Sequence, residues 1–256
     1  MVRELEKLVW GSEESVPVEQ TITAVKHGGM VLGAFLGERL IGFQYSFAGY
    51  DGKKTYLCSH SLGIHPDYRA SGIGYRLKLA QRTEAIRKGY DLITWTYDPL
   101  QTVNGNLNIR KLGAICSTYI ENCYGDMNDQ LNAGVPSDRF QVEWWITSDH
   151  VMDTLRKKRD PDSSVGFPAV IETTTNDQGF GVPLQVDLTL DQSAGKLLVP
   201  VPSSFQRLKE HDIGLAIEWR MKTRAVFSHY FQNGWSVREF VKQDGPEPVH
   251  YYVLDK

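Results

Sequence analysis

A short glycine-containing run carries the clearest chemical signal in this sequence. Arg69 is followed by glycines at 72 and 74, and the run joins an apolar stretch, residues 56–64, to a helical pattern that begins near Ile73. The first turn of a helix has unpaired N–H groups and lies at the positive end of the helix dipole. Glycine has no Cβ to keep a ligand away from the backbone. The succession of strand, glycine turn and helix therefore predicts an anion site suited to phosphate.

The segments around this turn alternate between helical and strand patterns. Residues 37–38 and 51–52 predict tight hairpin turns, and Pro66 ends the strand that leads into the glycine turn. The charged and polar residues of the helix after the turn, Lys78 and Gln81 among them, are expected to face solvent. Hydrophobic spacing predicts helices over 3–10, 18–27, 73–88 and 104–113, and strands over 30–35, 40–47, 55–64, 91–97, 114–124 and 139–147.

Two runs of residues resemble signatures of a known family. Residues 64–69, Ile-His-Pro-Asp-Tyr-Arg, and the following x-x-Gly-x-Gly resemble the pyrophosphate loop of the GNAT superfamily of acetyl-CoA-dependent N-acyltransferases. The segment from Asn104 to the Lys-Leu-Gly at 111–113 resembles that family's second signature. The resemblance covers about residues 1–148. It implies a mixed α+β fold, the GNAT fold, whose central, mostly antiparallel and splayed sheet is flanked by helices, with acetyl-CoA as co-substrate.

The resemblance also implies how the coenzyme would be held. Main-chain amides of the turn would bind the diphosphate, while the edge of the preceding strand would pair with the pantetheine arm. An N–H of Leu62 or Gly63 would polarise the acetyl carbonyl, and Gly63 stands where a strand bulge is required. The coenzyme-binding residues predicted in this way are Leu62, Gly63, Ile64, Arg69, Ala70, Ser71, Gly72, Ile73, Gly74, Tyr75 and Asn104.

Acetyl transfer to an amine also needs a base and an acid. An alkyl amine has a pKa of about 10 and arrives protonated, so a base must remove its proton. His60 is the first candidate for the base, ahead of the alternatives His65, Glu121 and Glu143. The family's usual acid, a tyrosine, is replaced here by Lys111. The resemblance places two tyrosines on the strand that lines the cleft, so the predicted catalytic residues are Tyr124, Tyr119 and His60.

The remainder of the chain predicts a second, smaller domain. The expected division is a GNAT domain over 1–148, a charged and proline-containing linker over 149–166, and an α+β domain over 167–256. Residues 224–237 echo the helix, glycine and strand of 104–119, so this half reads as a half-repeat of the GNAT fold without a second glycine turn. Its expected role is structural: it extends or covers the sheet of the first half. The strand that normally opens the GNAT fold is missing, so a sheet edge is expected to be exposed or covered by another segment.

The composition limits the partners and the compartment. The net charge of −3 predicts no nucleic-acid partner, and no run of about 18 apolar residues predicts a membrane span. Three cysteines and seven histidines show no ligand spacing, so no metal is expected. With no secretory leader, a cytoplasmic protein is expected. The acceptor is expected to be a small-molecule or peptide amine, and a homodimer is left open.

Three functional hypotheses follow. The first is an N-acetyltransferase in which the acceptor amine attacks the thioester of acetyl-CoA directly. The alternative is a non-catalytic acyl-CoA sensor or interaction module, which the lysine at 111 motivates. A dinucleotide-binding enzyme ranks last, because the turn lacks a third glycine and the preceding strands are joined as hairpins.

Overall fold

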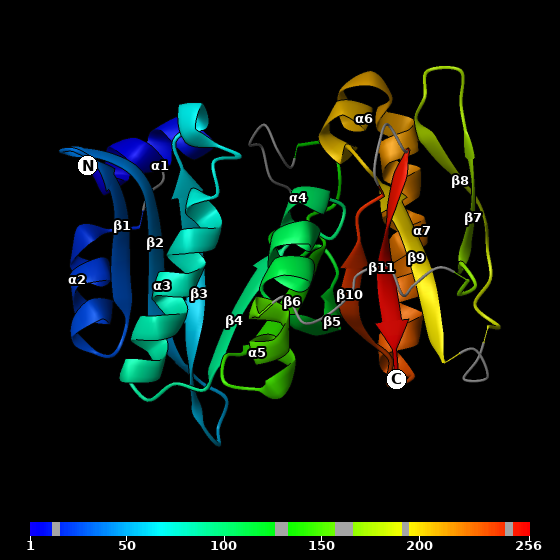
Figure 1. Cartoon of the computed structure of the whole chain (residues 1–256). Coiled ribbons are helices and arrows are strands. Elements are labelled where there is room, and N and C mark those ends of the chain that lie inside the picture. The colour runs from blue at the N-terminus through cyan, green and yellow to red at the C-terminus, as the bar shows by residue number, and fades with distance from the viewer. Residues whose placement is uncertain (12–15, 126–132, 157–165, 191–194, 244–247) are drawn as a thin grey trace. The chain divides into compact units, whose positions relative to one another are not determined.

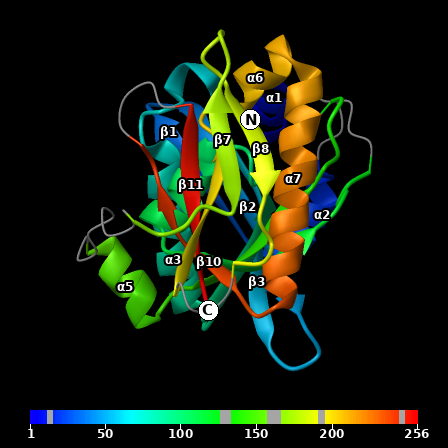
Figure 2. The ribbon, with the colours of Figure 1, turned by 90° about the vertical axis from the view of Figure 1, so that its right-hand side faces the viewer.

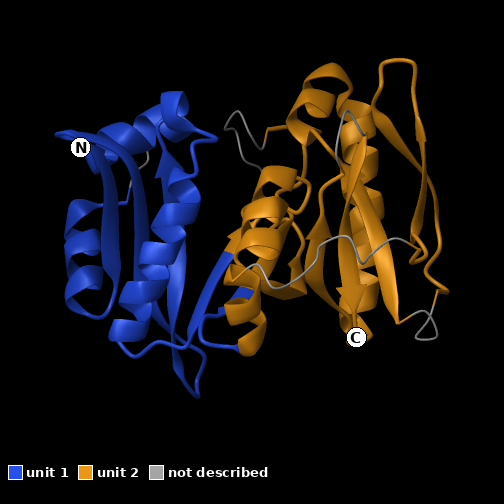
Figure 3. Cartoon of the chain, in the orientation of Figure 1, with its two compact units in different colours: residues 1–95, 143–148 blue, residues 96–142, 149–256 orange. Residues whose placement is uncertain are grey.

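The computed structural model (Figure 1) describes residues 1–11, 16–125, 133–156, 166–190, 195–243 and 248–256. Contacts divide the chain into two compact units (Figure 3). Unit 1 contains residues 1–95 and 143–148, and unit 2 contains residues 96–142 and 149–256. This division differs from the predicted domains at 1–148 and 167–256, which stay a prediction.

Unit 1 is built on a sheet with the strand order β1-β2-β3-β4. β1 pairs antiparallel with β2 and β2 with β3, whereas β3 and β4 are parallel. The elements follow the predicted order closely: α1 (Val2–Trp10), α2 (Val18–Lys26), β1 (Met30–Leu36), β2 (Arg39–Tyr50), β3 (Thr55–Ile64), the 3-10 turn η1 (Pro66–Tyr68), α3 (Ile73–Arg87) and β4 (Leu92–Tyr97).

The core of unit 1 forms on both faces of this sheet. On one face Leu5 of α1 packs with Leu40 and Phe43 of β2, and Trp10 packs against that cluster. On the other face α3 contributes the buried Leu77. Apolar burial of this kind supplies about 25 cal/mol per Å² and fixes α3 against the strands.

The outer strand β1 has only β2 as a neighbour within the described part of the chain. Val31, Phe35 and Leu36 on this strand are between 37 and 58% exposed. This agrees with the expectation of an exposed sheet edge.

Unit 2 contains a sheet in the order β6-β5-β10-β11-β9 and a separate pair, β7-β8. The long helix α7 packs against β5, β8 and β9, and Figure 2 shows it beside β8. The elements of unit 2 are α4 (Thr102–Gly105), the π-helix η2 (Asn106–Lys111), β5 (Ile115–Ile120), β6 (Arg139–Trp145, of which residues 143–145 belong to unit 1), α5 (Asp149–Leu155), β7 (Ile171–Thr175), β8 (Gly181–Val186), β9 (Lys196–Pro202), α6 (Phe205–His211), α7 (Ile213–Gln232), β10 (Ser236–Val241) and β11 (Val249–Asp255).

The C-terminal strands extend a sheet that earlier residues begin. β10 pairs antiparallel with β5 through Val237 and Cys116, and β11 and β9 continue beyond it. Extension of the sheet is one of the two structural roles expected from the sequence. Part of the predicted linker is ordered instead, because its first residues form α5, whereas residues 157–165 lie outside the described ranges.

The fold class predicted from the sequence is confirmed. The molecule is α+β with a mostly antiparallel sheet flanked by helices. Among the described strands of unit 1, β3 and β4 form a parallel pair, and β3 leads directly into the glycine turn. The order of elements from α1 to β6 is the order that the sequence predicts.

Candidate functional site

The glycine turn leaves the N-terminus of α3 uncovered. Ala70 and Gly72 have φ angles of 61° and 81°, so the chain passes twice through the left-handed region before α3 begins at Ile73. No side chain caps the helix, and its first turn contains no acidic residue. The N-terminus of α3 is therefore open toward an incoming anion.

The main-chain amides of this turn are available for binding. In the described ranges, residues 70–75 donate no backbone hydrogen bond, and the first helical bond runs from the N–H of Arg76 to the Gly72 carbonyl at 3.1 Å. Arg69 and the following residues to Gly72 are exposed. A run of unpaired amides at a helix N-terminus, with an exposed guanidinium beside it, is an arrangement that binds phosphate oxygens.

His65 supports the turn and is a poor candidate for the base. Its Nε2 lies 2.8 Å from the Arg39 guanidinium, which always donates, so the lone pair on this nitrogen is engaged. The other nitrogen, Nδ1, faces the carboxylate of Asp67 at 3.6 Å. The ring thus ties β2 to the start of the turn.

The strand before the turn has a free edge. β3 and β4 pair only through Leu57 with Ile93 and Cys58 with Thr94, and no other described strand pairs with residues 59–64 on that side. The N–H of His65 donates to Ile41 of β2 at 3.0 Å. Because successive amides of a strand point in opposite directions, those of residues 62 and 64 are directed to the free edge. These are the positions predicted for pantetheine pairing.

The expected bulge lies at a different residue. The register of β2 and β3 shifts at His60, between Ser59 and Ser61, whereas Gly63 pairs regularly with Phe43. A Cβ on Gly63 would lie 2.6 Å from the Phe43 ring, so glycine is needed there because an aromatic ring covers the strand. The prediction of a bulge at Gly63 is therefore wrong.

His60 occupies this bulge on an aromatic surface. The rings of Tyr45 and Phe47 lie 5.8 and 5.7 Å from its imidazole, although part of the ring remains exposed. Loss of water on the aromatic side lowers the pKa of His60. Its imidazole is therefore neutral at pH 7, the state that a base needs.

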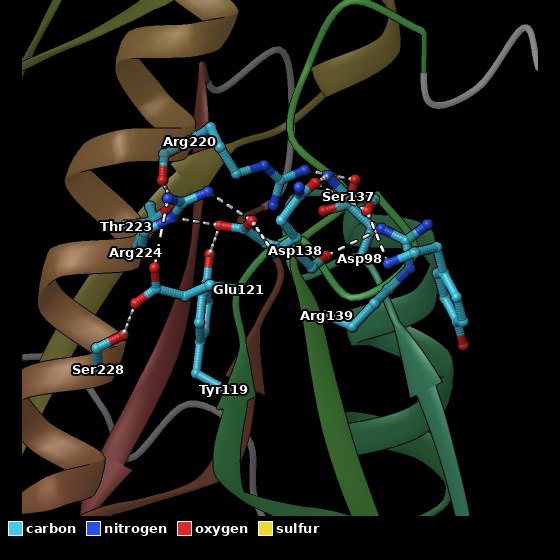
Figure 4. Close-up of polar contacts among 12 residues, drawn as sticks. Asp98, Tyr119, Glu121, Ser137, Asp138, Arg139, Arg220, Thr223, Arg224 and Ser228 are labelled. Atoms are coloured by element: carbon cyan, nitrogen blue, oxygen red, sulfur yellow. Dashed lines mark hydrogen bonds and ion pairs between the residues drawn. The ribbon is translucent and has the colours of Figure 1, made fainter. Parts of the chain in front are cut away.

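Tyr119, in unit 2, is held in a polar cluster (Figure 4). Its hydroxyl donates to Oδ2 of Asp138 at 2.7 Å, and the same carboxylate accepts two bonds from Arg224 at 2.7 and 2.8 Å. Burial raises the pKa of Tyr119 well above 10, and the neighbouring Asp138 adds to this. Burial also opposes ionisation of Asp138, but hydrogen bonds from Arg224 and the Asn122 N–H outweigh it, and the pKa of Asp138 is lowered. The hydroxyl proton of Tyr119 is already donated to Asp138 in this cluster. In this geometry Tyr119 therefore has a structural role.

Tyr124 is the more accessible of the two tyrosines. Its side chain is 57% exposed, and its hydroxyl lies 2.8 Å from Oγ1 of Thr96, at the end of β4 within unit 2. The Arg139 guanidinium lies 5.3 Å from its ring centre. An accessible phenol that already makes a hydrogen bond can deliver a proton, so Tyr124 keeps its predicted role as a proposal.

The other predicted residues are placed as follows. Asn104 lies on α4 in unit 2, half-buried, and Lys111 is exposed at the end of the π-helix η2. Of the alternative bases, Glu121 pairs with Arg224 at 3.4 Å, and Glu143 accepts a bond from the indole of Trp145 at 2.8 Å. Both carboxylates thus have partners of their own.

Sequence reasoning missed two groups of polar residues. Lys78 and Gln81, expected to face solvent, are 2% and 0% exposed. They project from α3 onto the sheet, so that expectation is wrong. Asp138 and Arg224 are also central to their unit but are far apart in the sequence, and no local spacing pointed to the pair.

Three further features of the described residues concern metal clusters, membrane-spanning helices and cavities. Among them no group of three or more His, Cys, Asp or Glu side chains is arranged to hold a metal ion. Within the same ranges, no helix has the length and apolar character of a membrane span. A cavity of about 220 Å³ in unit 2 is lined by Phe180, Arg207 and His250 among others, and none of the predicted site residues lines it.

Comparison with known proteins places this arrangement beside acetyltransferases. No family model and no curated protein matches the sequence. Among solved structures, the ribosomal-protein-S18-alanine N-acetyltransferase from Escherichia coli is 13% identical with a TM-score of 0.46, covering 57% of this chain and 86% of its own. A GNAT family acetyltransferase from Elizabethkingia anophelis with acetyl-CoA bound is 17% identical with a TM-score of 0.44, covering 57% and 90%. Aminoglycoside 6'-acetyltransferase type Ii is 18% identical with a TM-score of 0.43, covering 57% and 88%. Because these TM-scores lie below 0.5, the function proposed below depends on the geometry of this chain alone.

Proposed function

We propose that this protein is an acetyl-CoA-dependent N-acetyltransferase. The observation that carries the proposal is the free edge of β3 running directly into the turn whose amides, residues 70–75, are unpaired. A ligand that fits both features has a diphosphate at one end and amide groups along an extended arm. Coenzyme A has both.

The proposed binding mode follows from the backbone. The turn and Arg69 bind the diphosphate, and the free amides and carbonyls of Leu62 and Ile64 pair with the arm as a further strand would. The arm then directs the thioester toward the bulge at His60. The register shift there releases main-chain groups from β2, so an N–H of this region is the proposed donor to the acetyl oxygen.

The acceptor amine is proposed to bind on the face of the sheet that carries His60. Tyr45 and Ser61 are paired across β2 and β3 and so share a face. Their hydroxyl oxygens are buried and have no hydrogen-bond partner within the described residues. Buried hydroxyls are normally bonded, so an amine or a water that fills this place would satisfy them.

The chemistry is a direct transfer. His60 removes a proton from the acceptor ammonium, and the amine nitrogen attacks the thioester carbon. The C–N bond forms, the C–S bond breaks, and the thiolate takes a proton, a step for which the sequence resemblance implies Tyr124 as the donor. The products are the acetylated amine and coenzyme A with a free thiol.

Calorimetry with coenzyme A and a thiol-release assay with acetyl-CoA and a panel of amines test this proposal. We expect binding, and thiol release that depends on one class of amine. The absence of coenzyme binding at millimolar concentration would refute it.

Two observations favour a second candidate, an acyl-CoA sensor. The hydroxyl of Tyr119 is bonded to Asp138, and a lysine stands at position 111, where the family has its usual tyrosine. A sensor would bind acetyl-CoA without turnover on any amine.

A further inference from the structure

A buried lysine lies where β3 and β4 separate. The last paired residues of these strands are Cys58 and Thr94. The next residue on each strand, Ser59 and Trp95, contacts the same amine, that of Lys78 from α3. This amine therefore lies between the two strands and contacts both at the first position where they are no longer paired.

The contacts of this amine are close and complete. Nζ of Lys78 lies 3.1 Å from Oγ of Ser59, 3.0 Å from Oε1 of Gln81 and 3.4 Å from the centre of the Trp95 ring. The Trp144 ring lies further away, at 5.8 Å. An ammonium group has three donors, and two oxygens and one aromatic face satisfy them.

A further shell of polar groups holds this arrangement in place. Gln81 donates to the hydroxyl of Ser46 at 2.7 Å, and the amide of Gln44 lies 3.4 Å from Ser59. Both glutamines are 0% exposed. These residues come from β2 and α3, so the position of the lysine is set from several sides.

The lysine is an unfavourable choice for a core position. It is 2% exposed, and within the described residues no salt bridge joins it to a carboxylate; the Cys58 thiol is the titratable group that acts on its pKa electrostatically. Burial lowers the pKa of Lys78 well below its usual value. An apolar side chain would cost less free energy here, so the amine is expected to do something that an apolar group cannot.

We propose that Lys78 is a positioning residue that keeps β3 and β4 apart by binding Ser59 and Trp95, and so keeps the edge of β3 open for the pantetheine arm. This inference rests on the proposed function. Without the amine, the residues beyond Cys58 and Thr94 could continue the parallel pairing and close the edge. Lys78 acts on the arm only, because the diphosphate is held by the turn.

The experiment compares two ligands on the variant Lys78→Met. Coenzyme A carries both the diphosphate and the arm, whereas ADP carries the diphosphate without the arm. We expect calorimetry to show coenzyme A bound about tenfold more weakly by the variant, with ADP binding unchanged. An equal effect on both ligands, or no effect on either, would overturn the inference.

Lys54→Met is the matched control. The Lys54 amine also lies over a tryptophan ring in unit 1, 3.8 Å from the centre of Trp145, but away from the separation of the strands. Lys54→Met is expected to change neither the affinity for coenzyme A nor the affinity for ADP. If Lys78→Met fails to fold, Ser59→Ala takes its place, because it removes an acceptor of the amine and is expected to weaken coenzyme A selectively.

A second readout needs no ligand and so separates this inference from the proposed function. Hydrogen exchange at the amides of residues 60–64 is expected to be slower in Lys78→Met than in the natural protein, because new pairing to β4 protects them. Unchanged or faster exchange there would overturn the inference. Failure of the natural protein to bind coenzyme A would refute the proposed function and leave this measurement standing.

Discussion

The hydroxyl of Tyr119 donates to a carboxylate oxygen of Asp138 at 2.7 Å, and this carboxylate is fully buried. Arg224 binds the same carboxylate through two nitrogens. Through Arg224, α7 therefore has a fixed attachment to Asp138, the residue before β6, and through it to Tyr119 of β5. This arrangement also explains why the hydroxyl of Tyr119 is not free to donate its proton elsewhere.

The first prediction concerns the stability that this cluster supplies. Asp138→Asn leaves Arg224 without its buried partner, and we expect the free energy of unfolding to fall by about 2–4 kcal/mol, since a broken buried pair typically costs about 3–5 and Arg224 is partly exposed. Urea unfolding measures this. Glu121→Gln is the control: it removes an exposed partner of the same arginine and should cost less than about 1 kcal/mol. Equal losses of unfolding free energy in the two variants would contradict the conclusion that Asp138 is the stabilising partner of Arg224.

The second prediction concerns the glycine turn. Gly72→Ala is expected to weaken coenzyme A binding by more than about tenfold, because a Cβ there stands between the phosphate and the amides. The control is Gly89→Ala at the other end of α3. Both glycines have positive φ angles, 81° and 86°, and neither Cβ would meet an atom within 4 Å, so both substitutions carry the same backbone strain of about 1–2 kcal/mol. Calorimetry should show a loss of affinity for coenzyme A in Gly72→Ala and none in Gly89→Ala. An equal loss of affinity in both variants would exclude a role for the turn.

The third prediction assigns the acid. Tyr124→Phe is expected to lower kcat by about 10²–10⁴ and to leave the affinity for coenzyme A unchanged, since general acid catalysis contributes about this much. Tyr119→Phe is expected to lower stability without a comparable loss of kcat. Steady-state thiol release with the acceptor amine decides between them. The assignment would be reversed if the Tyr119 variant alone lost turnover.

The fourth prediction uses the pKa of His60. Contact with Tyr45 and Phe47 removes water from the His60 ring and lowers its pKa below 6.5. The midpoint of the fall in kcat at acid pH, where the ring takes up a proton and can no longer act as a base, should therefore lie below pH 6.5. The pH profile of kcat measures this midpoint. In His60→Gln the fall of kcat at acid pH should be absent. His65→Gln, at a ring engaged with Arg39, should retain it.

The fifth prediction concerns Lys78 and alkaline pH. The folded pKa of its amine lies well below the unfolded value of 10.5, so between these two values the unfolded chain binds more protons. Stability therefore rises with pH across that interval, by at most about 1.4 kcal/mol per pH unit from this one group. Subtracting the unfolding free energies of Lys78→Met from those of the natural protein isolates the effect. If the difference in unfolding free energy between the natural protein and Lys78→Met did not change from neutral pH to pH 10.5, the amine would not be buried in solution.

Local features of the chain were sufficient to predict most elements of unit 1. The bounds of β3, Thr55–Ile64, and the start of α3 at Ile73 follow from an apolar run, a proline and two glycines, all of which act within a few residues of themselves. The open turn was predictable for the same reason. The π-helix η2 was not, because the residues 104–113 carry an ordinary helical pattern.

The sequence by itself determined the fold class and the presence of an open glycine turn before α3, because backbone preferences of glycine and proline and the spacing of apolar residues are properties of neighbouring residues. Only the tertiary structure decided that Lys78 and Gln81 are buried, that the bulge lies at His60, and that Asp138 holds Tyr119 and Arg224. Each of these depends on which distant segment packs against the residue, and that pairing is settled only when the sheet and its helices assemble.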